Sequence, residues 1–184
     1  MHSITALCAV AAASLAADTD FPRFKEHVIN AEAGTGLAID AADIDADGDI
    51  DIIGVSADDV AWYENPEWTR HLIADTLKGS NVAVAPHDIN GDGTPELALG
   101  ADWQFNNTES GGALYLLRAG DDIREPWQVI TLIEEEPTLH RIRWADVEAD
   151  GKRELVVAPL KGRNSTGPNF QETPVDLFLL RPGE

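Results

Sequence analysis

The feature that most constrains the fold of this 184-residue chain is a nine-residue acidic segment that occurs three times. The copies align without gaps at residues 43–51 (loop 1), 88–96 (loop 2) and 146–154 (loop 3). Their starts lie roughly 50 residues apart, which is a period typical of propellers and solenoids. The sequence therefore predicts an array of equivalent units and not a set of unrelated domains.

Short runs rich in β-branched and aromatic residues surround each acidic loop, and Gly, Asn, Asp or Pro separates these runs. No stretch of ten or more residues keeps a helical period. Residues 24–29 resemble the fourth run of the first repeat, because Phe24-x-x-His27 matches Trp68-x-x-His71. We therefore predict an all-β partial propeller of three four-stranded blades, with residues 24–29 as the twelfth strand. The other predicted strands are 37–43, 51–55, 60–64 and 68–73; 82–88, 96–101, 113–118 and 127–133; and 140–146, 154–159 and 175–180.

The charge balance limits the classes of partner. The chain has 33 acidic and 13 basic residues, which gives a formal net charge of −20. Such a surface repels the phosphates of nucleic acids and anionic lipids. We therefore expect no nucleic-acid partner and regard cations as favoured ligands.

The first 17 residues contain no acidic residue, Lys or Arg, and most of them are apolar or small. This pattern is typical of a secretory signal peptide and is too short to span a bilayer. We therefore predict a signal peptide at 1–17, a three-blade segment at 18–184, no membrane span, and a secreted or periplasmic location. The single cysteine, Cys8, would leave with the signal peptide.

The acidic loops have the composition of calcium sites. Calcium takes six to eight oxygen ligands, and a curled loop supplies them from alternate residues. Positions 1, 3, 5 and 9 of each segment carry an oxygen-bearing side chain, position 6 is glycine, and position 7 would offer its backbone carbonyl. The alternative is a solvated acidic turn that binds no metal. The predicted calcium ligands are Asp43, Asp45, Asp47, Asp49 and Asp51; Asp88, Asn90, Asp92, Thr94 and Glu96; and Asp146, Glu148, Asp150, Lys152 and Glu154.

These loops differ from an EF-hand, because position 12 holds Gly54, Leu99 or Val157 where a bidentate Glu is required. A shortened acidic loop between two strands resembles the FG-GAP or VCBS family of propeller repeats. That resemblance implies calcium as the cofactor, bound between the first two strands of each blade. It also implies that the strand preceding each loop is the innermost of its blade, so that the three loops share one rim.

The opposite rim would gather two long polar loops and several of the scarce basic residues. Long polar loops with aromatic residues on a rigid scaffold are common ligand sites. We therefore predict a rim that binds a saccharide or protein ligand. The alternative is that Trp103 packs under its own loop and that the basic residues offset nearby acids. The predicted ligand-binding residues are Trp103, Asn106, His140, Arg141, Lys161 and Arg163.

The sequence contains no nucleophile motif, and whether the chain is an enzyme stays open. Residues 139–146 and 154–160 resemble the propeller part of aldos-2-ulose dehydratase relatives. This resemblance implies an alternative function, that of a fragment of a carbohydrate-active lyase or dehydratase. In that case His140 would act as the acid or base, and Arg141 or Lys161 would stabilise a carboxylate or enolate.

Three blades are too few for a closed ring, because closed propellers have four to eight. An exposed sheet edge is an association site unless another strand pairs with it. We therefore predict either a part of a longer propeller or self-association, in which two chains close a six-bladed ring by exchanging residues 24–29.

Overall fold

The computed structural model describes residues 22–75, 77–170 and 173–183. The described residues form eleven β-strands and no helix, so none of them could cross a membrane as a helix. The predicted signal peptide lies outside the described residues. The strands are β1 (Gly36–Ala42), β2 (Asp51–Ser56), β3 (Val60–Glu64), β4 (Thr69–Ala74), β5 (Ala83–His87), β6 (Glu96–Ala101), β7 (Ala113–Arg118), β8 (Gln128–Ile133), β9 (Leu139–Ala145), β10 (Glu154–Pro159) and β11 (Phe178–Leu180).

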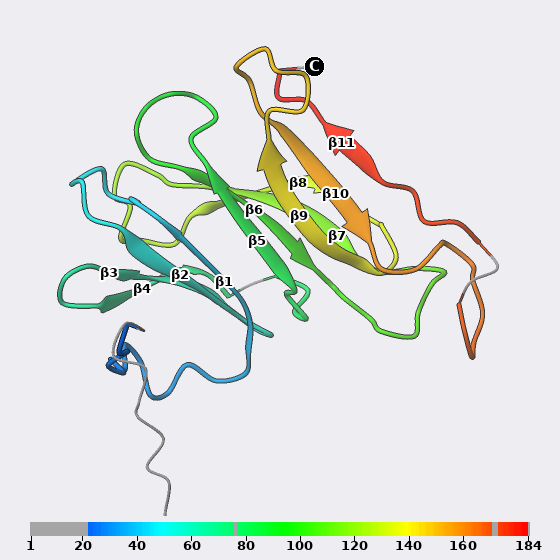
Figure 1. Cartoon of the computed structure of the whole chain (residues 1–184), viewed down its shortest axis with the longest axis horizontal. Coiled ribbons are helices and arrows are strands. Elements are labelled where there is room, and N and C mark those ends of the chain that lie inside the picture. Colours follow the sequence, from blue (N-terminus) through cyan, green and yellow to red (C-terminus); the bar gives the residue numbers. More distant parts are fainter. Residues whose placement is uncertain (1–21, 76, 171–172, 184) are drawn as a thin grey trace, which may run out of the picture.

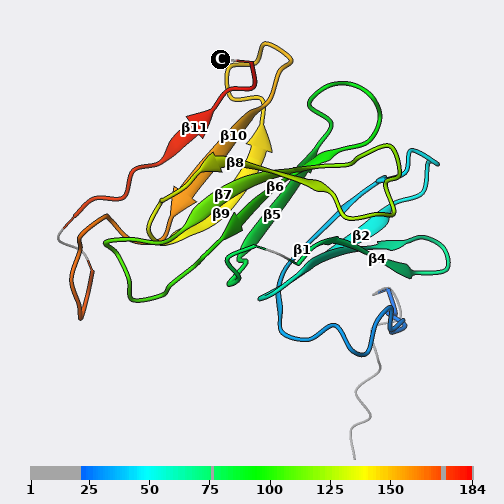
Figure 2. The same cartoon turned by 180° about the vertical axis from the view of Figure 1, so that it is seen from behind.

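The strands form three antiparallel sheets, which confirms the all-β prediction and is consistent with propeller-like repeats (Figure 1). Blade 1 has the order β1-β2-β3-β4, blade 2 has β5-β6-β7-β8, and blade 3 has β9-β10-β11. Each strand pairs with its neighbour in the sequence, as expected for short connections. Views from both sides place blade 2 between the other two (Figure 2).

The prediction of three four-stranded blades is wrong for blade 3, which has three strands. Residues 24–29 form no strand and lie beside blade 1, where Asn30 Nδ2 donates a hydrogen bond of 2.9 Å to Tyr63 Oη. The edge that lacks a fourth strand is β11, on the opposite side of the molecule (Figure 1). Within one chain this segment therefore cannot reach the edge that would pair with it.

Two apolar layers hold the blades together. Ile53 and Val55 of β2 and Leu97 and Leu99 of β6 belong to one apolar layer between blades 1 and 2. Alternate side chains of β6 point to the other face, where a second layer joins blade 2 to Leu155 and Val157 of β10. Tryptophan side chains contribute to these layers: Trp62 and Trp127 to the first, and Trp144 to the second.

The first strands of the three blades are neighbours, with β5 in contact with both β1 and β9. Because these strands run in the same sense, the three acidic loops emerge together at the upper end of Figure 1. The long connections β6–β7 and β10–β11 lie at the lower end. The fold thus separates an acidic rim from a rim of long loops.

Candidate functional site

Each acidic loop is closed at its base by the carboxylate at position 9. This carboxylate is buried in all three loops and accepts a hydrogen bond from the backbone N–H of position 2. The distances are 2.9 Å from Ile44 N to Asp51 Oδ2, 3.0 Å from Ile89 N to Glu96 Oε2, and 2.9 Å from Val147 N to Glu154 Oε2. Position 9 is therefore fixed by the fold. In loops 1 and 2 its second oxygen is also bonded: Asp51 Oδ1 accepts the N–H of Asn65 at 2.9 Å, and Glu96 Oε1 accepts from Asn90 Nδ2 at 3.1 Å.

The aspartate at position 1 fixes the curl of each loop. Its Oδ2 accepts the N–H of the position-6 glycine at 3.0 Å in loop 1, 2.9 Å in loop 2 and 3.0 Å in loop 3. The three glycines have φ of 98°, 96° and 87°, a conformation that side chains disfavour. The backbone N–H of position 7 then donates to the carboxylate at position 5. The donor and acceptor residues are Asp49 and Asp47 at 2.8 Å, Thr94 and Asp92 at 2.9 Å, and Lys152 and Asp150 at 2.9 Å.

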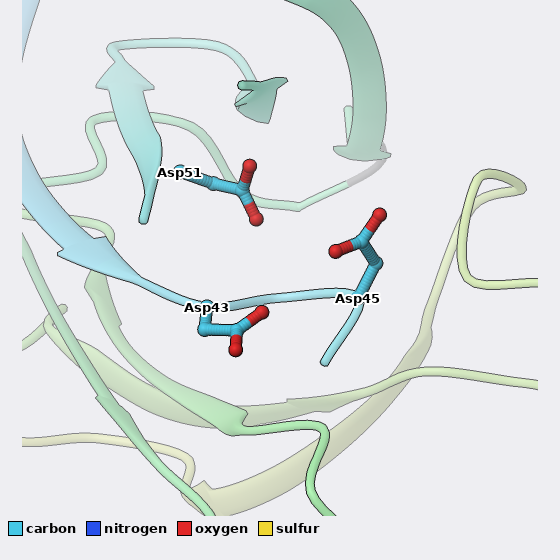
Figure 3. Close-up of side chains that lie close together, drawn as sticks. All are labelled: Asp43, Asp45 and Asp51. Carbon is cyan, nitrogen blue, oxygen red and sulfur yellow. The ribbon is translucent and has the colours of Figure 1, made fainter. Parts of the chain in front are cut away.

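Loop 1 brings three carboxylates together. One oxygen each from Asp43, Asp45 and Asp51 lies within 4.8 Å of the others, and the three side chains turn toward a common space (Figure 3). Burial, followed by the negative charge of Asp47, raises the pKa of Asp45 above its usual range. Burial is also the main cause that raises the pKa of Asp51. The carboxylates of Asp45 and Asp51 are therefore partly desolvated.

One cation of the protein already reaches this cluster. Arg124, in the connection between β7 and β8, places Nη2 3.2 Å from Asp45 Oδ2 and 2.5 Å from Glu64 Oε1. Its hydrogen bonds hold the pKa of Glu64 below the usual range, and His71 Nε2 lies 2.7 Å from the same carboxylate. Arg124 thus links blade 2 to loop 1 and leaves Asp43 and Asp51 without a cationic partner among the described residues.

Loop 2 is arranged differently, because Asn90 replaces a carboxylate at position 3. Its amide nitrogen donates to Asp92 Oδ2 at 2.8 Å and to Glu96 Oε1 at 3.1 Å. Arg118 Nε also donates to Glu96 Oε1, at 3.1 Å. Hydrogen bonds from the Thr94 backbone and the Asn90 side chain lower the pKa of Asp92.

Loop 3 is the most open of the three. Glu148 at position 3 is exposed and turns away to Arg181, whose Nη2 lies 2.5 Å from Glu148 Oε1. Asp146 Oδ1 accepts the N–H of Asp150 at 3.1 Å, so the loop backbone keeps the shape of loop 1. The shape is thus repeated, but the carboxylate convergence is not.

At the opposite rim, Trp103 contacts His140 and Phe105, and Phe105 in turn contacts Lys161. Lys161 is buried: its ammonium donates to the carbonyl of Phe105 and lies 3.8 Å and 3.7 Å from the ring centroids of Phe105 and Phe170. Arg163 pairs with Glu135 at 3.1 Å and with Glu136 at 3.7 Å.

Of the remaining predicted rim residues, Trp103 and His140 are in ring contact. The Trp103 ring lies 5.8 Å from Phe105 and 5.7 Å from His140, between centroids, so that it packs under its own loop. Burial, with a smaller effect of Arg141, lowers the pKa of His140. Arg141 is exposed on the other face of β9, because successive side chains of a strand alternate, and Asn106 is exposed near the loop tip. Sequence reasoning did not identify Phe105 and Phe170, the rings that enclose Lys161.

Replacing Lys161 by Met should loosen this rim. A hydrogen bond from a charged group contributes about 1.5–3 kcal/mol and a cation–π contact about 0.5–2 kcal/mol, so we expect a loss of about 2–4 kcal/mol in the free energy of unfolding. Urea unfolding and limited proteolysis of residues 102–112 would measure both effects. Lys78→Met is the control, because Lys78 is exposed and lies 3.9 Å from its nearest acid, Asp102. Equal stability of the two variants would contradict the prediction.

Comparison with known protein families supports a repeat assignment for part of the chain. Residues 43–99 match the model of the FG-GAP-like repeat. This segment runs from the start of loop 1 through β2, β3, β4 and β5 and loop 2 into β6. No curated protein matches the chain. The match supports the FG-GAP resemblance and a propeller-type module.

Proposed function

We propose that this chain is an exported, calcium-binding propeller-type module that recognises an extracellular saccharide. The calcium proposal rests on one observation, the convergence of carboxylate oxygens from Asp43, Asp45 and Asp51 within 4.8 Å. These donors are all oxygens, as a hard divalent cation requires, and softer metals prefer His or Cys ligands that this cluster lacks.

The donor sets predict an order of affinity among the loops. Loop 1 should bind calcium most tightly, because three of its carboxylates already converge, although calcium would have to displace Arg124 from Asp45. In loop 2 the Asn90 amide would have to rotate to present its oxygen, and Arg118 would have to leave Glu96. In loop 3 Glu148 would have to leave Arg181. Loop 2 and loop 3 should therefore bind more weakly.

Calorimetric titration with calcium tests the proposal and its order. We expect the wild type to show a tight binding phase that the double variant Asp43→Asn/Asp45→Asn lacks. The matched variant Asp146→Asn/Glu148→Gln in loop 3 should retain that phase and lose only weaker binding. The interpretation as solvated acidic turns predicts no saturable heat from any of the three proteins.

The recognition proposal concerns the rim of long loops. Two contacts join these loops: Asn164 N donates to Thr108 O at 2.9 Å, and Thr108 Oγ1 donates to Ser165 O at 2.7 Å. Together with the Lys161 contacts they hold Phe105 in place while leaving it 55% exposed. A fixed aromatic ring beside the exposed amide of Asn106 suits a sugar. The apolar face of the sugar would stack on the Phe105 ring, and its hydroxyls would hydrogen-bond to the amide.

Glycan-array and calorimetric binding with Phe105→Ala tests this surface. We expect at least a tenfold loss of affinity for any glycan that the wild type binds. Phe24→Ala is the control, because Phe24 is an exposed phenylalanine in the segment that precedes β1, outside the long β6–β7 and β10–β11 loops. If the wild type binds a protein and no glycan, the ligand is a protein and the saccharide proposal is wrong. If Phe105→Ala binds a glycan as tightly as the wild type does, the glycan does not bind at Phe105. N-terminal sequencing of the exported chain would test the predicted removal of residues 1–17.

A further inference from the structure

The repeat defines equivalent positions on the two faces of every blade. We call the face toward the preceding blade the front face and the face toward the following blade the back face. Counting from position 1 of the acidic loops, Ile39 of blade 1 corresponds to Val84 of blade 2 and Ile142 of blade 3. Val84 and Ile142 both lie on front faces, in the apolar layers against the blade before.

The front face of blade 1 is uncovered in one chain. Val84 and Ile142 are 7% and 9% exposed, whereas Ile39 at the same position is 72% exposed. A groove of about 770 Å³ lies on this face, lined by Leu37, Ile39 and Ile52 and bounded by residues 27–33. Blade 1 therefore presents an apolar surface where blades 2 and 3 each receive a neighbour.

The back face of blade 3 is uncovered in the same way. Ile44, at position 2 of loop 1, is fully buried against blade 2, whereas Val147 at position 2 of loop 3 is 53% exposed. The β2 residues Ile53 and Val55 are also buried, while their equivalents Val156 and Ala158 in β10 are only half-buried. Leu177, one residue before β11, is 69% exposed.

We propose that a second copy of this chain covers both surfaces, with the front face of blade 1 of each copy packed on the back face of blade 3 of the other. Within the chain, the back face of blade 1 packs on the front face of blade 2, and the back face of blade 2 packs on the front face of blade 3. The back face of blade 3 should therefore bind the front face of another repeat of this kind. The one free front face among the described residues is that of blade 1. Two copies joined twice make six blades, within the range of closed propellers.

This arrangement needs no exchange of strands, because residues 22–35 stay beside their own blade 1. Their contact from Asn30 to Tyr63 borders the groove and leaves Ile39 accessible. The charge of the chain opposes the pairing, since each copy carries a net charge of −20. Arg141 and Arg143 lie on the back face of blade 3, opposite Ala158 and Val156 of β10, and supply local positive charge. Pairing should therefore strengthen as added salt screens the long-range repulsion.

Sedimentation velocity of the purified protein tests the proposal over a hundredfold range of concentration. We expect a monomer at the lowest concentration, twice that mass at the highest, and a shift toward the larger species with salt. Ile39→Asp and Leu177→Asp should each keep the protein monomeric. Leu132→Asp is the matched control, since Leu132 is 41% exposed on the outer strand β8, away from both end faces.

Mixing the two variants distinguishes front-to-back pairing from other dimers. In a mixed pair of Ile39→Asp and Leu177→Asp chains, one of the two contacts keeps both natural faces, so the mixture should regain part of the larger species. A dimer that joins like faces would be abolished by only one of the two substitutions. That result overturns the proposal, as does a monomer at every concentration or a dimer that neither substitution weakens.

Discussion

Removal of calcium should lower the melting temperature of this protein by more than about 10 °C. One site held at a hundred times its Kd adds about 2.7 kcal/mol, and each kcal/mol shifts the melting temperature of a chain of this size by about 2–4 °C. Loop 1 alone thus contributes about 5–10 °C, and weaker binding at the other loops adds to it. The physical reason is that the folded chain gathers Asp43, Asp45 and Asp51, whereas the unfolded chain separates them.

Calorimetric melts in calcium, in magnesium and in excess chelator measure this effect. Magnesium is the control ion, because it demands a tighter octahedral shell and should protect less. Equal melting temperatures in calcium and in chelator would contradict the calcium proposal.

The substitution Asp45→Asn should change the melting temperature in opposite directions with and without calcium. Burial and Asp47 raise the pKa of Asp45, so its negative charge destabilises the metal-free fold at neutral pH. The uncharged amide of the variant would remove that destabilising charge. We therefore expect the variant to melt higher than the wild type in chelator and lower in calcium. A variant that melts lower in both buffers would show that the aspartate stabilises the fold without metal.

The sequence allowed most strands to be located, because the acidic loops anchor the register of their flanking strands. Position 9 begins β2, β6 and β10, and its buried carboxylate holds position 2 in all three loops. A local motif that fixes both strands of a hairpin can be recognised in a single sequence. The structure of a segment that depends on a distant partner cannot be predicted in this way.

Residues 24–29 illustrate that limit. Their pattern matches β4, and β-propensity measures how well a segment fits an existing sheet more than an intrinsic backbone preference. The free edge of β11 lies beyond blade 2 from this segment (Figure 1). Without an edge to pair with, the same pattern gives an irregular segment on blade 1.

The rim of long loops illustrates the same limit for the candidate site. Lys161 was predicted to bind a ligand because it is one of the scarce basic residues at the rim of long polar loops. Phe105 and Phe170, which enclose its ammonium, come from two different loops, and nothing in the sequence indicates that they meet. By contrast, the packing of Trp103 under its own loop follows from local proximity and was one of the two alternatives that the sequence left open.

Trp62 should be the most costly single side chain to truncate. It is fully buried on β3, where it pairs with Ile53 and lies in the layer between blades 1 and 2. Its ring is 4.7 Å from His71 and 6.0 Å from the Arg124 guanidinium. Replacing a buried Trp by Ala costs about 3–5 kcal/mol through lost burial and the cavity that remains. We expect Trp62→Ala to lose this amount in urea unfolding.

Trp62→Phe should cost much less, for a specific reason. The indole Nε1 is buried and has no hydrogen-bond partner among the described residues, so removing it relieves an unsatisfied donor. That relief, about 1–3 kcal/mol, offsets much of the smaller ring's lost contact. Trp68→Ala is the control for a tryptophan that is only half-buried, at a turn beside His27.

The two Trp62 variants should also differ at loop 1. Trp62 lies in the same apolar layer as Ile44, whose backbone N–H donates to Asp51 of loop 1 at 2.9 Å. Trp62→Ala should therefore weaken calcium binding at loop 1 several-fold, whereas Trp62→Phe retains a ring and should leave it near the wild-type value. Calorimetric titration of both variants under conditions where both are folded separates this effect from stability. If the Phe and Ala variants of Trp62 prove equally costly, the indole N–H has a partner and the packing argument for this layer is wrong.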